Sequence, residues 1–340
     1  MSPSFISYIL SKAPARAARK SPVFFAPSIR WYIYLNNGRL IIPPILLPVY
    51  SNGFKDPKRL NPSWVCSVMM TKQSTGLDWR FVAEETWDGP TNMALDEVAA
   101  ETVAEGGPAT IRLFRWAPST LSLGYNQDPE TIDWEQCDRE GIGVTRRPTG
   151  GGAIYHDNYG DISYAIVVPA DAAPGNLMDT YELLCEPVLA AFDALGVDVS
   201  FAPEERPAVH QPACYLRALD PAHDVVGPDG RKIAGNAQYR RKDAVVQHGS
   251  LTYSLAPDAH CGCFTGRPDP AGFTERVGAI DEYVDVSRAD AVKAVERSLQ
   301  SWADAPAGEW TSDERDRAAV LAESKYGAAE WTRGGEDPTR

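Results

Sequence analysis

The sequence predicts an α+β fold, in which helices flank a mixed, largely antiparallel sheet. Predicted strands come in runs, with helices interspersed irregularly, whereas regular βαβ winding would alternate them. A turn signal at Pro228-Asp229-Gly230 separates two extended runs, as in an antiparallel hairpin. Two further strand candidates, residues 143–147 and 153–156, flank a glycine run with no helix between them.

Periodicity and breaker residues place the elements along the chain. A helix over 92–105 follows the start signal Pro90-Thr91, and Met93, Leu95 and Val98 fall at helical spacing within it. The longest β-rich run covers 161–169. We expect further strands at 79–86, 109–116, 121–125, 143–147, 153–156, 197–201, 231–237 and 244–254, and further helices at 132–140, 177–195, 289–303 and 312–326.

Charge divides the chain into two parts. Of 33 basic and 46 acidic residues, residues 1–70 hold nine basic ones and a single acid, Asp56. The remaining 270 residues carry a net charge of −21 and only five lysines. We predict that residues 1–70 are a basic extension, disordered or the product of an upstream start codon, and that 71–340 form one folded domain. A targeting segment is the alternative for the extension.

The acidic, lysine-poor composition of the folded domain bears on its environment and partners. Such a surface stays hydrated at high salt, which indicates a halophile, and it repels phosphate backbones, so we expect no nucleic-acid partner. No run reaches the ~18 apolar residues of a membrane helix, so we expect no membrane association. The six cysteines show no regular framework, which favours free thiols and a cytoplasmic protein.

The segment from Arg146 to Asp157, RRPTGGGAIYHD, is the first that points to chemistry. Consecutive glycines let backbone N–H groups approach an anion or a carbonyl closely, and the two arginines add positive charge. The spacing matches neither a Walker loop nor a dinucleotide fingerprint. A plain glycine turn with arginines on the surface is the alternative.

Lys232 and Cys214 are the candidate reactive groups. Lys232 lies among small residues in GRKIAGNAQ, where a lysine can polarise a carbonyl or neutralise a phosphate; a solvated hairpin lysine is the alternative. Cys214, on the preceding loop, is a candidate nucleophile or an inert loop thiol. His260-Cys261-Gly262-Cys263 invites a zinc assignment, but three ligands within four residues need distant help, so we expect no metal.

Together these segments resemble the family of lipoate–protein ligases and octanoyltransferases, which is related to the biotin protein ligases. The resemblance covers residues 78–332 and rests on the Arg-Arg-x-Thr-Gly-Gly-Gly stretch, on Gly-Arg-Lys-Ile-Ala-Gly around Lys232, and on Gln247-His248-Gly249-Ser250. Further matching segments are Asn92 to Glu97, Leu121 to Gln127, and Lys325-Tyr326 to Glu330-Trp331.

The resemblance implies a fold like the catalytic domain of class II tRNA synthetases and biotin synthetase, with residues 71–340 as the catalytic domain. It also implies that Cys214 is the nucleophile and that Lys232 fixes the acyl carbonyl and supports the thiolate. The resemblance implies that the segment from Arg146 to His156 lines the acyl or acyl-adenylate pocket. The expected substrate-binding residues are Arg146, Arg147, Thr149, Gly150, Gly151, Gly152, Ala153, His156, Gly235, Ala237, His248 and Gly249.

Two mechanisms share this scaffold. A cysteine-dependent octanoyltransferase takes octanoyl from the thioester of a carrier protein and needs no cofactor. A lipoate–protein ligase activates free lipoate or octanoate with ATP and Mg²⁺, and some ligases keep an accessory domain on a separate subunit. Ala213-Cys214-Tyr215 favours the transferase, whereas the Gly150–Ala153 form is common among ligases.

We favour octanoyl transfer, through an acyl-Cys214 enzyme, to a lysine of a lipoyl-domain acceptor protein. The ligase remains the alternative, and the existence of a separate accessory subunit stays open. A non-catalytic acyl- or nucleotide-binding paralogue is a remote third hypothesis, since such a protein would need neither Cys214 nor Lys232.

Overall fold

The computed structural model describes residues 76–220 and 223–339 and, within the first 75 residues, the backbone of four short strands. The chain divides into two units, Met1–Met69 and Met70–Arg340. The predicted disorder of residues 1–70 lies outside the described residues. The strands of the first unit pair antiparallel, β1 (Val23–Phe24) with β2 (Arg30–Trp31) and β3 (Tyr34–Asn36) with β4 (Arg39–Ile41).

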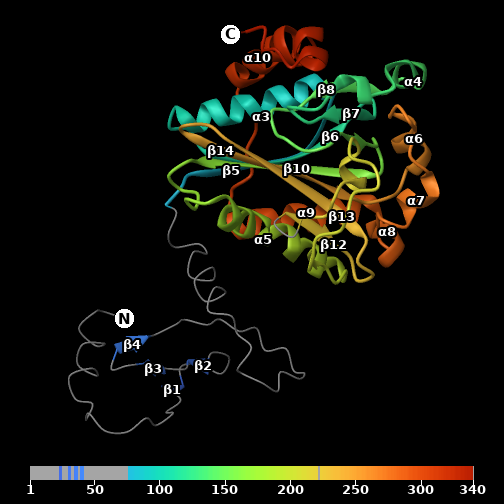
Figure 1. The fold of residues 1–340 in the computed structure, drawn as a ribbon. Coiled ribbons are helices and arrows are strands. Elements are labelled where there is room, and N and C mark those ends of the chain that lie inside the picture. The colour runs from blue at the N-terminus through green and yellow to red at the C-terminus, as the bar shows by residue number, and fades with distance from the viewer. Residues whose placement is uncertain are drawn as a thin grey trace. The chain divides into compact units, whose positions relative to one another are not determined.

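The second unit is built on a seven-stranded sheet with the order β11-β12-β13-β14-β10-β6-β5 (Figure 1). Only β5 and β6 are parallel neighbours, so the sheet is mixed and largely antiparallel, as predicted. Its strands are β5 (Trp79–Trp87), β6 (Ala109–Trp116), β10 (Asp161–Pro169), β11 (Ser200–Phe201), β12 (Asp224–Val226), β13 (Lys232–Arg240) and β14 (Ala244–Thr252).

A small sheet with the order β8-β7-β9 carries the glycine run. β7 pairs parallel with β8 and antiparallel with β9, so the run from the end of β8 to the start of β9 must cross β7. The strands are β7 (Thr120–Leu123), β8 (Gly143–Arg146) and β9 (Ile154–His156).

Helices cover both faces of the seven-stranded sheet, with α3 and α10 on one side and α5 and α9 on the other (Figure 1). The helices are α3 (Gly89–Ala104), α4 (Trp134–Arg139), α5 (Leu177–Leu195), α6 (Pro257–Gly262), α7 (Pro270–Thr274), α8 (Ile280–Tyr283), α9 (Arg288–Ala303) and α10 (Ser312–Leu321). Single turns add η2 (Pro129–Thr131), η3 (Cys214–Leu216), and the π-helical η4 (Ala322–Tyr326) and η5 (Glu330–Gly334).

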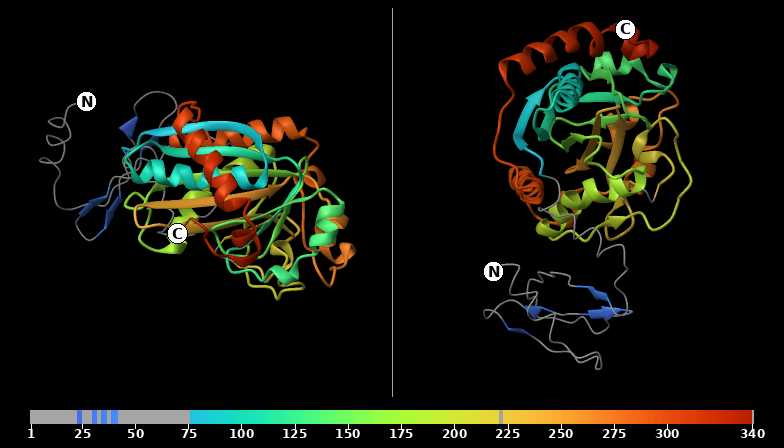
Figure 2. Two further views of the ribbon diagram at one scale, coloured as in Figure 1. Left: turned by 90° about the horizontal axis from the view of Figure 1, so that it is seen from above. Right: turned by 90° about the vertical axis from the view of Figure 1, so that its left-hand side faces the viewer.

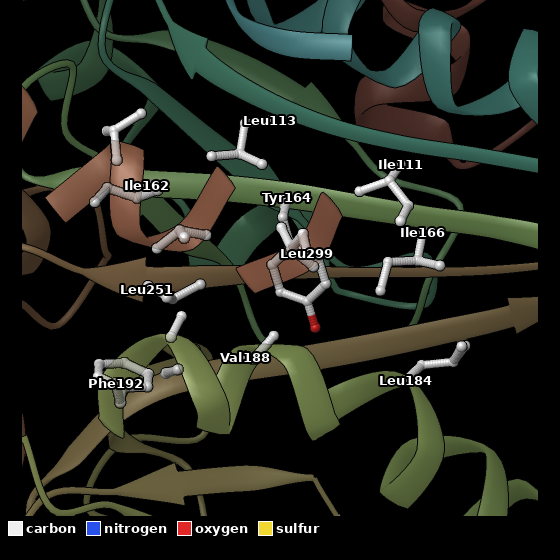
Figure 3. Packing of buried hydrophobic residues seen from close by; sticks show 14 of the residues in the cluster. Ile111, Leu113, Ile162, Tyr164, Ile166, Leu184, Val188, Phe192, Leu251 and Leu299 are labelled. Carbon is white, nitrogen blue, oxygen red and sulfur yellow. The ribbon is translucent and has the colours of Figure 1, made fainter. Parts of the chain in front are cut away.

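The central strand β10 shows why two cores form. Successive side chains of a strand point to opposite faces. Ile162, Tyr164 and Ile166 therefore pack against α5 and α9 (Figure 3), while Ala165 and Val167 pack on the opposite face with α3. Burial on both faces explains the continuous apolar run at 161–169.

The second core lies under α3, and α10 runs beside this helix in both views of Figure 2. Asp88 caps α3 by accepting from the Thr91 N–H, and Pro90 occupies the first turn. The helix also buries Asn92, Asp96 and Glu97, so polar groups enter the interior here and need partners.

The predicted ranges of β6, β10 and α5 match the structure. Three short helices, α6 to α8, were not predicted. The predicted helix 312–326 ends as α10 at Leu321 and continues as the π-helical η4, and the predicted strand 197–201 is reduced to β11. Within the described part of the chain, no helix combines the length and apolarity that crossing a membrane requires.

Candidate active site

A cavity of about 530 Å³ is lined by residues from both sheets, the glycine run and the turn η3. The structure brings most of the predicted site residues together around it. The predicted residues that line the cavity are Cys214, Lys232, Arg147, Gly150, Gly151, Gly152, His156, Gly235, Ala237, His248 and Gly249.

Cys214 begins η3, and backbone pairing fixes this turn against the small sheet. The Cys214 N–H donates to the Ala153 carbonyl at 2.8 Å, and the Ala153 N–H donates to the Pro212 carbonyl at 2.8 Å. The thiol is partly exposed and lines the cavity. Nζ of Lys232 lies 3.8 Å from its Sγ. An ammonium at this distance can stabilise negative charge on Sγ, and a thiolate is the nucleophilic form of cysteine.

Lys232 is buried, with 3% of its surface exposed, so the alternative of a solvated hairpin lysine is wrong. Its Nζ pairs with Oδ1 of Asp224 at 2.7 Å. Burial by itself lowers the pKa of Lys232, but the negative charges of Cys214 and Asp224 outweigh burial and raise that pKa above its ordinary value. Lys232 is therefore held as an ammonium.

Two glycines, Gly235 and Gly152, leave room for Lys232 and for the turn that carries Cys214. A Cβ at Gly235 would lie 3.3 Å from Cε of Lys232 and 3.8 Å from Sγ of Cys214. A Cβ at Gly152 would lie 2.7 Å from the Pro212 carbonyl and 2.9 Å from the Cys214 nitrogen. Both contacts at Gly152 involve backbone atoms that cannot move cheaply, so a side chain there would displace the turn that carries the thiol.

Arg147 fixes the glycine run through hydrogen bonds to its backbone carbonyls. Its guanidinium donates to the carbonyls of Gly150, at 2.8 Å, and Gly152, at 2.7 Å. It also donates to the Ser122 carbonyl of β7 at 2.7 Å. Burial lowers the pKa of Arg147 to about 10, so the group stays charged at neutral pH. Most of its donors are used within the protein, which favours a loop-shaping role.

Arg146, Thr149 and Ala153 do not line the cavity, unlike the other predicted residues. The Arg146 guanidinium instead donates to backbone carbonyls of Gly124, Tyr125 and Gln127 and of the C-terminal turn η5. A buried guanidinium needs several acceptors, and these carbonyls supply them. The guanidinium therefore has acceptors within the chain, and the predicted role of Arg146 in substrate binding stays a prediction.

His248 is anchored by a buried polar network beneath the cavity. Its Nε2 lies 2.8 Å from the Thr149 hydroxyl and its Nδ1 lies 3.0 Å from Asp96. Asp96 also pairs with the buried Arg112 at 3.0 Å. The Thr149 hydroxyl thus contacts the His248 ring, and its predicted role in substrate binding stays a prediction.

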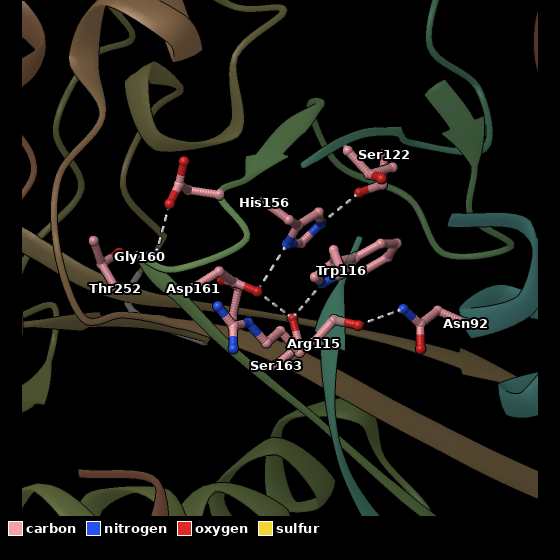
Figure 4. Close-up of polar contacts among 12 residues, drawn as sticks. Asn92, Arg115, Trp116, Ser122, His156, Gly160, Asp161, Ser163 and Thr252 are labelled. Atoms are coloured by element: carbon pink, nitrogen blue, oxygen red, sulfur yellow. Dashed lines mark hydrogen bonds and ion pairs between the residues drawn. The ribbon is translucent and has the colours of Figure 1, made fainter. Parts of the chain in front are cut away.

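His156 belongs to a second network, shown in Figure 4. Its Nε2 lies 2.9 Å from the Ser122 hydroxyl and its Nδ1 lies 3.2 Å from Asp161. The ring stacks on Trp116, with centroids 4.1 Å apart. Burial lowers the pKa of His156, although Asp161 opposes this effect, so the imidazole is neutral at neutral pH.

Asp224, Ser122, Asp161 and Asp96 were missed by sequence reasoning, although each contacts a predicted residue. Asp96 lies in the matching segment NMALDE, and Asp161 follows His156 by five residues, so both lay close to a sequence signal. Asp224 carried none, because only the pairing of β12 with β13 brings it to Lys232. Ser122 lies in the matching segment Leu121 to Gln127, but only the pairing of β7 with β9 brings it to His156.

The zinc alternative at residues 260–263 finds no support. Among the residues that the structure describes, no three His, Cys, Asp or Glu side chains are grouped so as to hold a metal ion. His260, Cys261 and Cys263 are buried, and the His260 ring packs against Phe264 and Phe273. These side chains fill an apolar cluster.

Comparison with known proteins places this geometry in a family. The family model of the lipoyl protein ligase A/B catalytic domain matches residues 88–300. The octanoyltransferase LipM of Anoxybacillus flavithermus is 32% identical over 271 residues, which cover 74% of this chain and 97% of that protein. The chain belongs to the lipoyl protein ligase A/B family. The LipM protein of Bacillus subtilis, another family member, is 30% identical over the same length and the same shares.

Solved structures of the family agree with the fold. A bi-partite lipoate protein ligase from Thermoplasma acidophilum is 25% identical with a TM-score of 0.64, over 76% of this chain and 98% of that one. Lipoate-protein ligase A bound with ATP is 24% identical with a TM-score of 0.65, over 76% and 100%, and shows the fold alone. The predicted family, fold and enzyme class, an octanoyl-type acyltransferase, are thus confirmed.

Proposed function

We propose that this lipoyl protein ligase A/B family member transfers an octanoyl group from a carrier-protein thioester to a lysine of a lipoyl-domain acceptor, through an acyl-Cys214 intermediate. One observation carries the proposal: a partly exposed thiol on the cavity wall, 3.8 Å from a buried ammonium. The relatives named octanoyltransferase LipM support the acyl group and the reaction type.

In the first half-reaction, the Cys214 thiolate attacks the carbonyl carbon of the donor thioester, and the donor thiolate leaves. The Lys232 ammonium stabilises both the attacking thiolate and the negative charge that develops on the carbonyl oxygen. Apolar side chains that line the cavity, among them Met93, Phe114 and Ile154, give the acyl chain a surface on which to pack.

In the second half-reaction, the acceptor amine attacks the octanoyl-Cys214 thioester and Cys214 leaves as a thiolate. The same ammonium stabilises this leaving group. Acylation removes the negative charge of Cys214, but Asp224, 2.7 Å from Nζ, still favours the ammonium form of Lys232, so we assign Lys232 an electrostatic role and not that of the proton acceptor.

The proposal includes no cofactor. ATP, Mg²⁺ and a separate accessory subunit belong to the ligase alternative. We further propose that residues 71–340 carry the activity, that residues 1–70 are dispensable, and that the protein works in the cytoplasm of a halophile. A chain that starts at Met70 should therefore retain folding and activity, best assayed at high salt.

Intact mass of an apo lipoyl domain tests the proposal. One reaction supplies an octanoyl-loaded carrier without ATP; the other supplies lipoate or octanoate with ATP and Mg²⁺; each is repeated with Cys214→Ala. Modification from the carrier alone, abolished by the substitution, is the expected result. Modification that requires ATP and ignores the substitution would establish a ligase and overturn the proposal.

A further inference from the structure

The contacts of His156 form a hydrogen-bonded chain that leads from the cavity into the protein. Ser122, at the cavity wall, lies 2.9 Å from Nε2 of His156, and Nδ1 of the same ring lies 3.2 Å from Oδ2 of Asp161 (Figure 4). All three side chains are buried, with 1–5% of their surface exposed. The order hydroxyl, imidazole, carboxylate is the order of a proton relay.

The partners of this chain fix the direction in which a proton can move. A carboxylate only accepts hydrogen bonds, so Nδ1 of His156 carries the ring proton and Nε2 is left as an acceptor. The Ser122 hydroxyl must then donate to Nε2. A proton that reaches Ser122 from the cavity side can therefore pass inward to the imidazole.

Asp161 is well prepared to hold the imidazolium that would result. It accepts from the hydroxyls of Ser163, at 2.5 Å, and of Ser250, in addition to His156. Trp116 stacks on the imidazole and donates to the Ser163 hydroxyl at 2.9 Å, which locks the ring's orientation. A fixed base beside a fixed carboxylate needs little rearrangement when it takes up a proton.

The network of His248 has the same composition, but its hydroxyl lies elsewhere relative to the cavity. There too a hydroxyl contacts Nε2 and a carboxylate contacts Nδ1, but the hydroxyl belongs to Thr149, which does not line the cavity. Asp96 is in addition paired with Arg112. Of these two networks, the Ser122 chain is the one that combines a cavity-facing hydroxyl with a carboxylate hydrogen-bonded to two serine hydroxyls and the imidazole.

The transfer reaction needs such an acceptor, because an amine that attacks a thioester becomes positively charged and must lose a proton to form an amide. Lys232 is held as an ammonium by Asp224, 2.7 Å away. Arg147 links Ser122 to the loop that packs on Cys214, since its guanidinium donates to the carbonyls of both Ser122 and Gly152.

We propose that Ser122 and His156 form the base that takes the proton from the acceptor lysine, with Asp161 as the positioning residue. This inference rests on the proposed function. The pair of Cys214 and Lys232 serves both half-reactions, whereas the relay serves only the transfer to the amine.

The neutral amine attacks the carbonyl carbon of octanoyl-Cys214, and the nitrogen gives its proton to Oγ of Ser122 while the Ser122 hydroxyl proton moves to Nε2 of His156. The C–N bond forms, the C–S bond breaks, and the Cys214 thiolate leaves beside Lys232. The imidazolium returns its proton to solvent before the next cycle.

The test compares an amine with a thiolate as acceptors. Octanoyl-Cys214 enzyme is formed with an octanoyl-loaded carrier and confirmed by intact mass. It is then chased either with an apo lipoyl domain or with dithiothreitol, whose thiolate has no proton to lose. In Ser122→Ala and His156→Gln we expect transfer to the lipoyl domain to slow about a hundredfold, the lower range for a lost general base, and transfer to dithiothreitol to change less than threefold.

Thr145→Val is the matched control. Thr145 pairs in register with Ser122 on the neighbouring strand β8, but its buried hydroxyl donates to the Tyr326 carbonyl at 3.1 Å, away from the cavity. Both transfers should stay within threefold of the wild-type rates. Thermal unfolding of each variant checks that it is folded.

Two outcomes would overturn the relay: equal slowing of both transfers in Ser122→Ala, which indicates a structural role, or no slowing of either. Failure of the wild-type enzyme to form octanoyl-Cys214 would overturn the proposed function itself, and the relay with it. Intact mass after the first step shows whether octanoyl-Cys214 has formed, and so distinguishes failure of the proposed function from failure of the relay alone.

Discussion

Cys214 and the pair Cys261 and Cys263 represent two opposite environments for a thiol in this molecule. Cys214 is partly exposed at the cavity and lies 3.8 Å from an ammonium. Cys261 and Cys263 are fully buried in an apolar cluster with Phe264. Burial raises the pKa of Cys261 to about 11, and a hydrogen bond with Cys137 together with burial raises that of Cys263. Burial therefore works against reactivity at Cys261 and Cys263, whereas Cys214 is partly exposed and lies beside an ammonium.

The largest effect that this comparison predicts is the loss of the nucleophile. Cys214→Ala should lower octanoyl transfer by roughly a thousandfold or more, because no acyl-enzyme can form. Cys261→Ala, which removes a thiol that faces no cavity, should leave the rate within about twofold. Both are measured by intact mass of the lipoyl domain against time. Equal loss in the two variants would contradict the contrast between the two environments.

Removal of the cation should have the next largest effect. Lys232→Gln keeps most of the volume but removes the charge that favours the thiolate and the developing oxyanion, so formation of octanoyl-Cys214 should slow about a hundredfold. Lys293→Gln, at an exposed ion pair with Asp290 on α9, is the control. An unchanged rate of acylation in Lys232→Gln would show that the ammonium is not needed beside the thiol.

Asp224→Asn should have a smaller effect, about tenfold on acylation, and should alter its pH dependence. In the wild type, Asp224 helps to raise the pKa of Lys232, so the ammonium persists into the alkaline range. Without the carboxylate that pKa falls, and activity should be lost at a lower pH on the alkaline side. A uniform decrease at every pH would instead indicate a structural defect.

The matched control for that variant is Asp229→Asn. Asp229 pairs with Arg231 at 2.7 Å on the neighbouring turn, where both groups are partly exposed. Its removal should leave the pH–rate profile of acylation unchanged.

The smallest expected effect is the extent to which iodoacetamide alkylates Cys261. A thiol with a pKa near 11 is almost wholly protonated at pH 8, so Cys261 should stay unlabelled in the native protein while Cys214 is carboxamidomethylated. Peptide mapping after labelling measures both. In guanidinium chloride the two cysteines should react alike. If Cys261 in the native protein were labelled as fast as Cys214, the contrast between the two thiol environments would be contradicted.

The sequence predicts an element well where local signals mark both of its ends. The helix α5 begins after Asn176, whose side chain accepts from the Asp179 N–H, and ends at Gly196, which has a φ of +80°. The helices α6 to α8 have four to six residues each, too short for a helical period to appear, and therefore went unpredicted.

The site shows the same limit at the level of side chains. Cys214 and Lys232 could be proposed from residue type and neighbours alone. Asp161 meets Ser250 because β10 and β14 pair in a register that sets Ser163 opposite Ser250, and no local pattern encodes that register. Arg146 and Arg147 look equivalent in sequence, yet successive residues of an extended chain face opposite ways.

Arg146 also connects segments that lie far apart in the sequence and are therefore synthesised at different times. Its guanidinium joins the carbonyls of residues 124, 125 and 127 to those of Trp331 and Thr332, and the Trp331 indole donates back to the Arg146 carbonyl at 2.7 Å. During synthesis, the hydrogen bonds from Arg146 to the carbonyls of Trp331 and Thr332 can therefore form only after residues 331–332 have left the ribosome. A nascent chain therefore carries Cys214 and Lys232 before residues 331 and 332 are available to anchor the strand that leads into the glycine run.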